Sequence, residues 1–383
     1  MANAASPTPV VIIGGGPNGL LLACLLAQRS IGVRVLEQRQ NLAARPRAFG
    51  IHPAALDALD AAGVGTQVRA EALAIGGGEF SSEQRSGARR VLAVLRFDAN
   101  SPRPLVLAQQ RVEQLLAERL DALQPGALER GVTVVSVTPH AEVVQLVVRD
   151  AHGEHPATAR FAVVCDGTRS ALRDQLGVRW QRRSGAGQYA MADAPAEPRD
   201  EPWVRLHGAR AGVVESFPLP DHRRRWVVGL GSHEPAPTEP ELAALVRERL
   251  GESPELMEGT ASTFTAQQHL AHPLARGRAV LLGDAAHEVS PIGGQGLSLG
   301  WAAARRLAPA LERSLRDGEP RFAAYARSTR RAALRGHRRA RLFMRVGRAA
   351  SGARSRARDA LVLVLGAPIF APIARHLVVL HRA

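Results

Sequence analysis

The stretch Val10-Val-Ile-Ile-Gly-Gly-Gly-Pro-Asn-Gly19 decides the fold of this 383-residue chain. Its apolar first half predicts a central parallel strand that is buried on both faces. Gly14, Gly16 and Gly19 match the pattern G-x-G-x-x-G, and residues 20–28 predict a helix rich in leucine and alanine. These glycines permit a tight turn, close approach of the backbone to a pyrophosphate, and close packing of helix on strand. We therefore expect a dinucleotide-binding βαβ unit here.

The residues around this turn support that interpretation. Pro17 and Asn18 stand where free N–H groups at a helix N-terminus favour phosphate. Residues 33–37 predict the next strand, which ends in Glu37, an acid at the position expected to hold ribose hydroxyls. Gln38 follows directly. A βαβ turn without a ligand is the alternative interpretation.

Two more turns of this kind lie far along the chain. Cys165-Asp-Gly-Thr-Arg-Ser170 follows one apolar run, and Gly283-Asp-Ala-Ala-His287 follows another and leads into Pro291-Ile-Gly-Gly-Gln-Gly296. Either pair alone is ordinary turn chemistry. In this order and company they predict that distant segments converge on one large cofactor, for which FAD is the natural candidate.

The composition bounds the partners and the compartment. The formal net charge is +15, and all 50 basic residues are arginine. Thirteen of them lie between Arg321 and Arg358, a segment without Asp or Glu, so removing these 13 from +15 leaves only +2 for the rest. This local basicity, without a zinc-finger or RNP-like pattern, predicts no nucleic-acid partner. Two isolated cysteines and no signal peptide favour a reduced, cytoplasmic protein without disulfides or metal.

The chain is expected to be an α/β protein with a Rossmann-like domain interrupted by an antiparallel sheet. Short strands alternate with turns from about Trp180 to Gln268, and apolar strand and helix patterns flank them. The predicted cofactor domain comprises residues 1–75, 105–178 and 270–320, and the substrate domain residues 76–104 and 179–269. Residues 321–383 predict basic and then apolar C-terminal helices.

The three turns in combination resemble the single-component FAD-dependent aromatic monooxygenases, typified by para-hydroxybenzoate, phenol and ubiquinone-pathway hydroxylases. The resemblance covers about residues 9–310. It implies a flavoprotein in which NADPH or NADH reduces FAD, O2 adds to give a flavin hydroperoxide, and oxygen passes to an electron-rich aromatic, polyketide or quinone-type molecule. The protein would supply geometry, electrostatics and a dry pocket.

The resemblance also implies which residues contact the cofactor. It assigns Asp284 to a ribityl hydroxyl, the segment from Gly293 to Leu297 to the isoalloxazine, and Asp166 with Gly167 to FAD and the passing nicotinamide. The full expected set is Gly14, Gly16, Pro17, Asn18, Gly19, Glu37, Gln38, Arg47, Gln109, Asp166, Gly167, Gly283, Asp284, Pro291, Gly294, Gln295, Gly296 and Leu297. Ser298 stands where the family often has Asn, and Ala302 or Ala303 where it often has Asp, so fine tuning of the flavin differs.

The substrate side is much less determined, and no catalytic side chain is identified. Pro291 and Ile292 are expected to line the flavin site, and His52 is either a pocket residue or a capping or packed histidine. Candidates from the inserted sheet are Tyr189, Trp203, Arg205 and Phe217, although alternating aromatic and β-branched residues usually form core.

The last segment leaves a membrane question open. Residues 361–374 carry no charge and follow the arginine-rich helix, but they are too few for the roughly 20 residues that span a bilayer. Residues 340–380 therefore predict either peripheral contact with anionic lipid at the inner face of the membrane or a helix packed on the cofactor domain.

Other functions remain as alternatives. An isoprenoid reductase or epoxidase of the same superfamily is one, and an FAD-stabilised regulatory protein is another. A flavin-dependent halogenase would need a lysine, which this chain lacks, and a nicotinamide-only dehydrogenase would have no use for Asp284. The oligomeric state is open.

Overall fold

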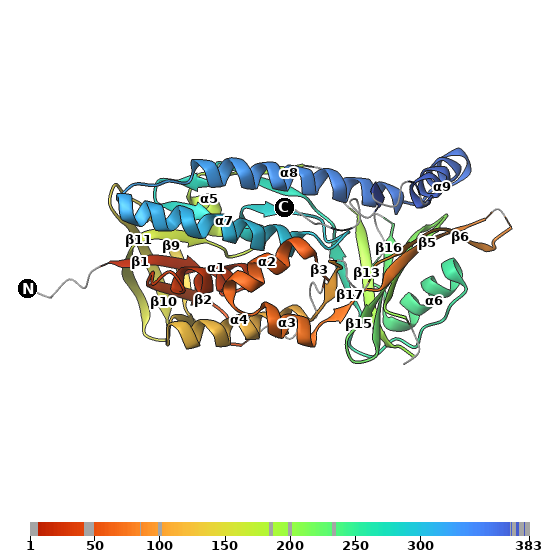
Figure 1. Cartoon of the computed structure of the whole chain (residues 1–383), viewed down its shortest axis with the longest axis horizontal. Helices are drawn as coiled ribbons and strands as arrows, with labels where there is room; N and C mark the ends of the chain where they lie inside the picture. Colours follow the sequence, from red (N-terminus) through yellow and green to blue (C-terminus); the bar gives the residue numbers. More distant parts are fainter. Residues whose placement is uncertain are drawn as a thin grey trace, which may run out of the picture.

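The computed structural model describes residues 7–41, 50–84, 86–98, 102–183, 187–197, 201–231 and 235–367, together with 369, 373–374 and 379. Two large sheets lie side by side along the long axis of the molecule, and helix α8 (Ala323–Val346) runs past both of them (Figure 1). The mixed α/β architecture expected from the sequence is confirmed.

Sheet A forms the half that contains the first glycine turn. Its parallel strands follow the order β20-β11-β1-β2-β8, with β1 at the centre. Antiparallel partners β19 and β10 extend it, and β9 pairs with β10. The strands are β1 (Thr8–Ile13), β2 (Val33–Glu37), β8 (Leu128–Arg130), β9 (Thr133–Pro139), β10 (Val144–Asp150), β11 (Gly153–Val164), β19 (Ala275–Arg276) and β20 (Ala279–Leu281).

Both faces of strand β1 are buried, as its continuous apolar sequence requires. Val10 and Ile12 pack into one core cluster with the helices, whereas Val11 and Ile13 pack into a second cluster on the other face. Trp301 is fully buried and donates from Nε1 to the carbonyl of Pro17 at 3.1 Å, which fixes α7 on α1. The helices of this half are α1 (Pro17–Ala27), α2 (Pro53–Ala62), α3 (Gly65–Glu71), α4 (Gln109–Leu123), α5 (Ala171–Gln175) and α7 (Gly296–Asp317).

Sheet C forms the other half, in the order β17-β13-β16-β15-β14-β5-β6. All of its described pairings are antiparallel except that of β14 with β5. Helix α6 (Glu239–Leu250) packs Leu242 and Val246 against one face, here called the outer face. The strands are β5 (Gly77–Glu83), β6 (Arg89–Arg96), β13 (Gln188–Pro195), β14 (Trp203–Ala209), β15 (Gly212–Leu219), β16 (Arg223–Leu230) and β17 (Ser262–Thr265).

Small elements connect the two halves. Sheet B has the order β3-β7-β4, and sheet D the order β12-β18-β21. Helix α9 (Gly352–Gly366) packs on β6. The remaining strands are β3 (Gly50–Ile51), β4 (Leu73–Ala74), β7 (Leu105–Val106), β12 (Arg179–Arg182), β18 (His269–His272) and β21 (His287–Glu288), and a 3₁₀ turn covers Gly283–Ala285.

Several predicted elements match the structure closely. Residues 33–37 form the strand that their sequence predicts. Helix α1 begins earlier than expected, because Pro17 is pre-set for the first helical position. Helix α3 was not predicted, since Gly63 and Gly65 interrupt the helical pattern there. The proposed domain boundaries stay a prediction, although the described strands of sheet C all lie within residues 77–96 and 188–265.

Candidate functional site

In the turn after β1, the fold itself requires glycine at positions 14 and 19. Gly14 has φ +109°, and a Cβ there would lie 2.4 Å from the carbonyl oxygen of Cys165. A Cβ on Gly19 would lie 2.1 Å from the carbonyl oxygen of Gly14. Both positions therefore exclude any side chain, because the turn, helix α1 and the end of the neighbouring strand β11 meet there.

Gly16 differs from its neighbours. Its φ is −77°, which any residue adopts, and a Cβ there would meet nothing within 4 Å. Neither backbone strain nor packing asks for glycine at this position. The open space lies at the N-terminus of α1, where unpaired N–H groups attract an anion. This is the arrangement expected of a phosphate-binding turn.

The acid at the end of β2 lies beneath the same turn. Glu37 accepts hydrogen bonds from the backbone N–H of Gly15 at 2.7 Å and from the Nε of Arg39 at 2.8 Å. Burial alone would raise the pKa of Glu37, but these hydrogen bonds outweigh it and hold the pKa below its ordinary value. Glu37 is thus a fixed carboxylate, while Gln38 beside it is exposed.

Gln109 begins helix α4 and donates from its amide to Glu113 at 2.7 Å. The hydrogen bond to Glu37 is the main cause that raises the pKa of the Arg39 guanidinium. The negative charge of Glu113 nearby raises the pKa of Arg39 further. Gln109 therefore belongs to a polar group near the β2 acid. Arg47 lies outside the described residues.

The second turn follows strand β11. Gly167 has φ +90°, and Ser170 caps α5 by accepting from the N–H of Arg173 at 3.0 Å. Burial raises the pKa of Asp166, against the opposing hydrogen bond from Ser170. The buried Oδ1 of Asp166 has no hydrogen-bond partner among the described residues.

The third turn is closely packed against the first. Gly283 has φ +63°, and a Cβ there would lie 2.5 Å from Nδ2 of Asn18. Asp284 is exposed, although Gly283 and Ala285 on either side of it are buried. The strand therefore presents one carboxylate outward at its carboxyl end.

The glycine-rich segment before α7 lies against His52. Gly293 and Gly294 have φ +90° and +64°, and Nε2 of His52 lies 3.0 Å from the carbonyl oxygen of Gly293. The backbone N–H of His52 donates to Oγ of Ser298 at 3.2 Å. Gln295 is fully buried, and both of its side-chain amide atoms lack partners among the described residues. His52 is thus packed on this loop, at the N-terminal end of α2.

Sheet register brings the three turns to one edge. Ile13 pairs with Val164, and Val164 pairs with Leu281, all in parallel strands. The turns that follow these residues must therefore lie side by side at the carboxyl ends of the strands, where open α/β sheets bind ligands.

The residues at this edge fit FAD. Buried polar atoms of Asn18, Asp166 and Gln295 have no partner in the described part of the chain, and Gly16 leaves a cradle that a side chain would fill. Buried polar groups are normally hydrogen-bonded, so these atoms indicate a site for a polar ligand. Within the described residues no cluster of His, Cys, Asp and Glu could hold a metal ion.

The substrate candidates divide between the two faces of sheet C. Tyr189, Val213 and Val227 pack with Ile292 of the glycine-rich segment, so they define the inner face of the sheet. Phe217 contacts this cluster too. Arg205 pairs with Ser216, and both alternate with inner-face residues, so the structure places Arg205 on the outer face together with Trp203. Pro291 is exposed beside Ile292.

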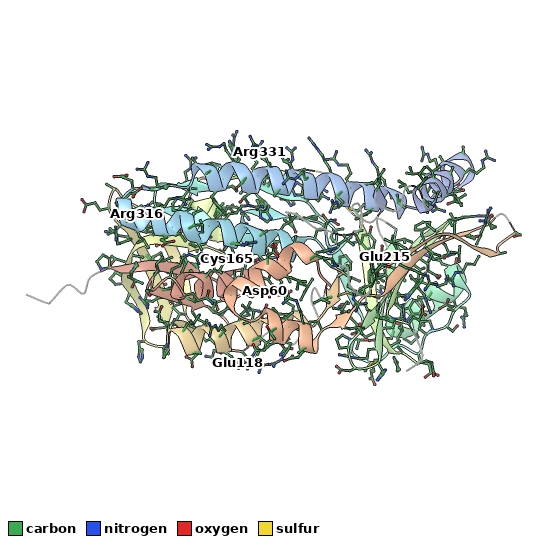
Figure 2. All side chains as sticks on the ribbon, in the orientation of Figure 1. Asp60, Glu118, Cys165, Glu215, Arg316 and Arg331 are labelled. Carbon is green, nitrogen blue, oxygen red and sulfur yellow. The ribbon has the colours of Figure 1, made fainter. Side chains whose placement is uncertain are left out.

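Glu215 is a residue that the sequence reasoning missed. It lies between Val213 and Phe217 on strand β15, pairs with Val227, and is only 8% exposed. Figure 2 labels it where sheet C meets the other half of the molecule. Burial raises the pKa of Glu215 to about 7. The sequence did contain a signal for Glu215: it is the one acid at the alternate positions 213, 215 and 217, where the other two residues are apolar.

Glu215 is expected to make stability depend on pH. The folded state holds its proton up to about pH 7, whereas an unfolded glutamate loses it near pH 4.5, so wild-type stability falls as pH rises between these values. Glu215→Gln removes this dependence. Urea unfolding should show the variant gaining about 3 kcal/mol over wild type between pH 4 and pH 8. Exposed Glu118→Gln is the control, and an equal change there would contradict the assignment.

Comparisons with known proteins agree with the geometry. The family model described as "FAD binding domain" matches residues 7–340. A 6-methylpretetramide 4-monooxygenase of Streptomyces rimosus is 30% identical over 312 residues, which are 78% of this chain and 54% of that protein. A para-nitrophenol 4-monooxygenase of Pseudomonas sp. is 29% identical over 337 residues, 81% of this chain and 79% of that protein.

Solved structures extend the likeness to nearly the whole chain. The p-nitrophenol 4-monooxygenase PnpA of Pseudomonas putida superposes with a TM-score of 0.85 over 97% of this chain and 98% of that one, at 22% identity, which shows a shared fold. The anhydrotetracycline hydroxylase OxyS of Streptomyces rimosus has a TM-score of 0.77 at 28% identity, over 97% of this chain and 76% of that one. The chain spans only 54–62% of the length of the first curated relatives it matches.

Proposed function

Because the chain belongs to the family of FAD-binding domains, we propose that it is an FAD-dependent monooxygenase. In this proposal NADPH or NADH supplies the electrons, and O2 supplies the oxygen atom that is inserted. The substrate is an electron-rich aromatic, polyketide or quinone-type small molecule. The names of the similar monooxygenases support this substrate class.

One observation carries the proposal. The glycine turn, the Asp166 turn and the Asp284 turn follow neighbouring parallel strands, and Asn18, Asp166 and Gln295 at this edge have buried polar atoms without described partners. A nicotinamide-only enzyme would need the first of these turns but not the other two.

The chain's own residues would hold the cofactor and shape the reaction site. Bound FAD supplies electron transfer and activation of O2. The turn at Gly16 and the N-terminus of α1 would hold the pyrophosphate, and Asp284 a ribityl hydroxyl. The N-terminal N–H groups of α7 would stabilise negative charge on the ring system. The apolar inner face of sheet C would exclude water from the reacting atoms.

Purified protein tests the proposal directly. We expect a flavin absorbance spectrum, and NAD(P)H oxidation with O2 uptake that a phenolic or quinone compound stimulates. Product mass should rise by one oxygen atom. A colourless protein that takes up no FAD would sink the proposal. Flavin binding without stimulation by any such compound would leave an FAD-stabilised regulatory protein as the better explanation.

Asp284→Ala is expected to weaken FAD binding by about 10- to 100-fold, because one hydrogen bond to a charged acceptor is lost. The side chain of Asp284 is exposed and so can reach a bound cofactor. Fluorescence titration of apoprotein with FAD measures the change. Asp150→Ala, in the hairpin between β10 and β11 at the opposite edge of sheet A, is the matched control. Equal affinities for both variants would show that Asp284 does not contact FAD.

As a second, separate proposal, we infer that the protein works in the cytoplasm and contacts a membrane at its periphery. No described helix is both long and apolar enough to cross a membrane. Helix α9 exposes Leu361, Leu363 and Val364 by 39–53%, with arginines in its first turns. Figure 2 shows Arg331 on the side of α8 that faces away from the sheets. Such a surface suits anionic lipid, and binding would favour the isoprenoid alternative.

Flotation with anionic liposomes tests this contact. We expect the wild-type protein to float and the variant Leu361→Glu with Val364→Glu to remain at the bottom. Neutral liposomes serve as the control for charge. If wild type does not float, or if the variant floats equally, the lipid contact is wrong and these side chains have another role.

A further inference from the structure

We propose that Glu215 is the polar anchor of the substrate site and accepts a hydrogen bond from a phenolic hydroxyl group. This inference rests on the proposed function and narrows its substrate class. It predicts neutral, apolar aromatic substrates that carry a hydroxyl donor. Aromatic substrates that carry a carboxylate would be disfavoured.

The pairing of the strands places Glu215 on the inner face of sheet C. Side chains alternate along β15, so Glu215 shares a face with Val213 and Phe217. Its cross-strand partner Val227 lies on the same face. Val213 and Val227 both pack with Ile292, which follows Pro291 in the segment that leads to the N-terminus of α7. The carboxyl group is therefore surrounded by side chains that meet the expected flavin site.

The surroundings of Glu215 are apolar. Tyr189, Val213 and Val227 of the sheet join Ile292 and Met344 in one cluster, with Phe217, Phe264 and Phe343 packed against it. Glu215 is only 8% exposed, and burial alone raises the pKa of its carboxyl group. A carboxyl group buried to this extent is costly to leave without a hydrogen-bond donor, so its place on this face favours a ligand that supplies one.

Several titratable groups lie near Glu215. On the same face, Arg225 donates to both oxygens of Asp193 at 2.7 and 3.0 Å. Burial raises the pKa of Tyr189 to about 12, with a further rise from Glu215 and a reduction from Arg348. His52, on the facing loop, is bonded to Gly293. None of these groups forms an ion pair with Glu215 in the described structure.

This arrangement suits a phenol. The carboxylate accepts the hydroxyl hydrogen, and in the limit it takes the proton while the phenol oxygen keeps the electron pair. The substrate ring then becomes more electron-rich, as oxygen insertion requires. A substrate carboxylate at this place would face the like charge of Glu215, which is unfavourable in an apolar setting.

The test measures binding to the FAD-loaded protein with two probes, 1-naphthol and its methyl ether. Perturbation of the flavin absorbance spectrum reports each dissociation constant. Wild type should prefer 1-naphthol, and Glu215→Leu should bind it about 10- to 100-fold more weakly. Binding of the ether should stay unchanged or improve. Wild-type affinity for 1-naphthol should also rise with pH through neutrality, and this rise should vanish in Glu215→Gln.

Controls separate the outcomes. Glu79 is a glutamate of the same sheet that lies on the outer face, opposite Arg205 in the register of β5 and β14. The variant Glu79→Gln should therefore behave as wild type. Equal effects of Glu215→Leu on both probes, or no effect, would overturn the proposal, as would failure of the FAD-loaded protein to bind 1-naphthol. Failure to bind FAD at all would instead contradict the proposed function.

Discussion

Alanine in place of Gly16 is expected to weaken FAD binding by about 100-fold while the fold stays intact. Gly16 has an ordinary φ of −77° and open space beside it, so the protein tolerates a methyl group there. The pyrophosphate of FAD would not tolerate the methyl group, because the methyl group would occupy the space through which the phosphates approach the backbone. Loss of two hydrogen bonds to a charged group, at about 1.5 kcal/mol each, gives this factor.

Alanine in place of Gly14 should damage both properties. The added Cβ would lie 2.4 Å from a backbone oxygen, and φ is +109°. Strain of this kind costs about 1–3 kcal/mol before any steric overlap is relieved. Urea unfolding of the apoprotein and titration with FAD distinguish the two variants. Gly32→Ala, where the nearest atom would lie at 3.5 Å, is the control. If Gly16→Ala bound FAD normally, the phosphate would not lie at this turn.

Asp193→Ala is expected to destabilise the protein by about 3–5 kcal/mol. Asp193 and Arg225 are each 3% exposed, and the carboxylate accepts two hydrogen bonds from the guanidinium. Removing the acid leaves the buried charge of Arg225 without its main compensation. The free energy of urea unfolding measures the loss.

A surface pair provides the control for this change. Asp57 lies 3.1 Å from Arg305, but the two side chains are 68% and 54% exposed. Asp57→Ala should therefore cost no more than about 1 kcal/mol. Replacing both buried partners, with Asp193→Leu and Arg225→Met, should recover much of the loss because no charge then stays buried. Similar values for Asp193→Ala and Asp57→Ala would contradict this account.

The sequence was sufficient to predict how the cofactor edge is built. Each of its three turns follows an apolar run, and parallel strands bring their carboxyl ends to the same edge. Glycine at positions 14 and 19 reports a contact that no other residue permits. Such positions can be identified because local backbone geometry and tertiary packing impose the same requirement.

The substrate side could not be predicted in the same way. Alternation along β15 shows that Val213, Glu215 and Phe217 share one face, but it does not show which neighbour covers that face. The choice between inner and outer face depends on α6 and on the segment containing Ile292, both distant in sequence. For this reason Arg205 looked equivalent to Phe217 in the sequence, although the sheet turns them to opposite faces.

Helix α8 has a mechanical consequence. Its 24 residues span roughly 36 Å. Near its first turn, Tyr325 donates to the carbonyl of Leu281 at 2.7 Å, and near its last turn Met344 packs with Tyr189 and Val227. Helix α8 is therefore a single rigid element that is fixed to both halves of the molecule. Hinged swinging of one half about the other would have to break an anchor, so admission of a substrate is expected to depend on smaller movements of connecting segments.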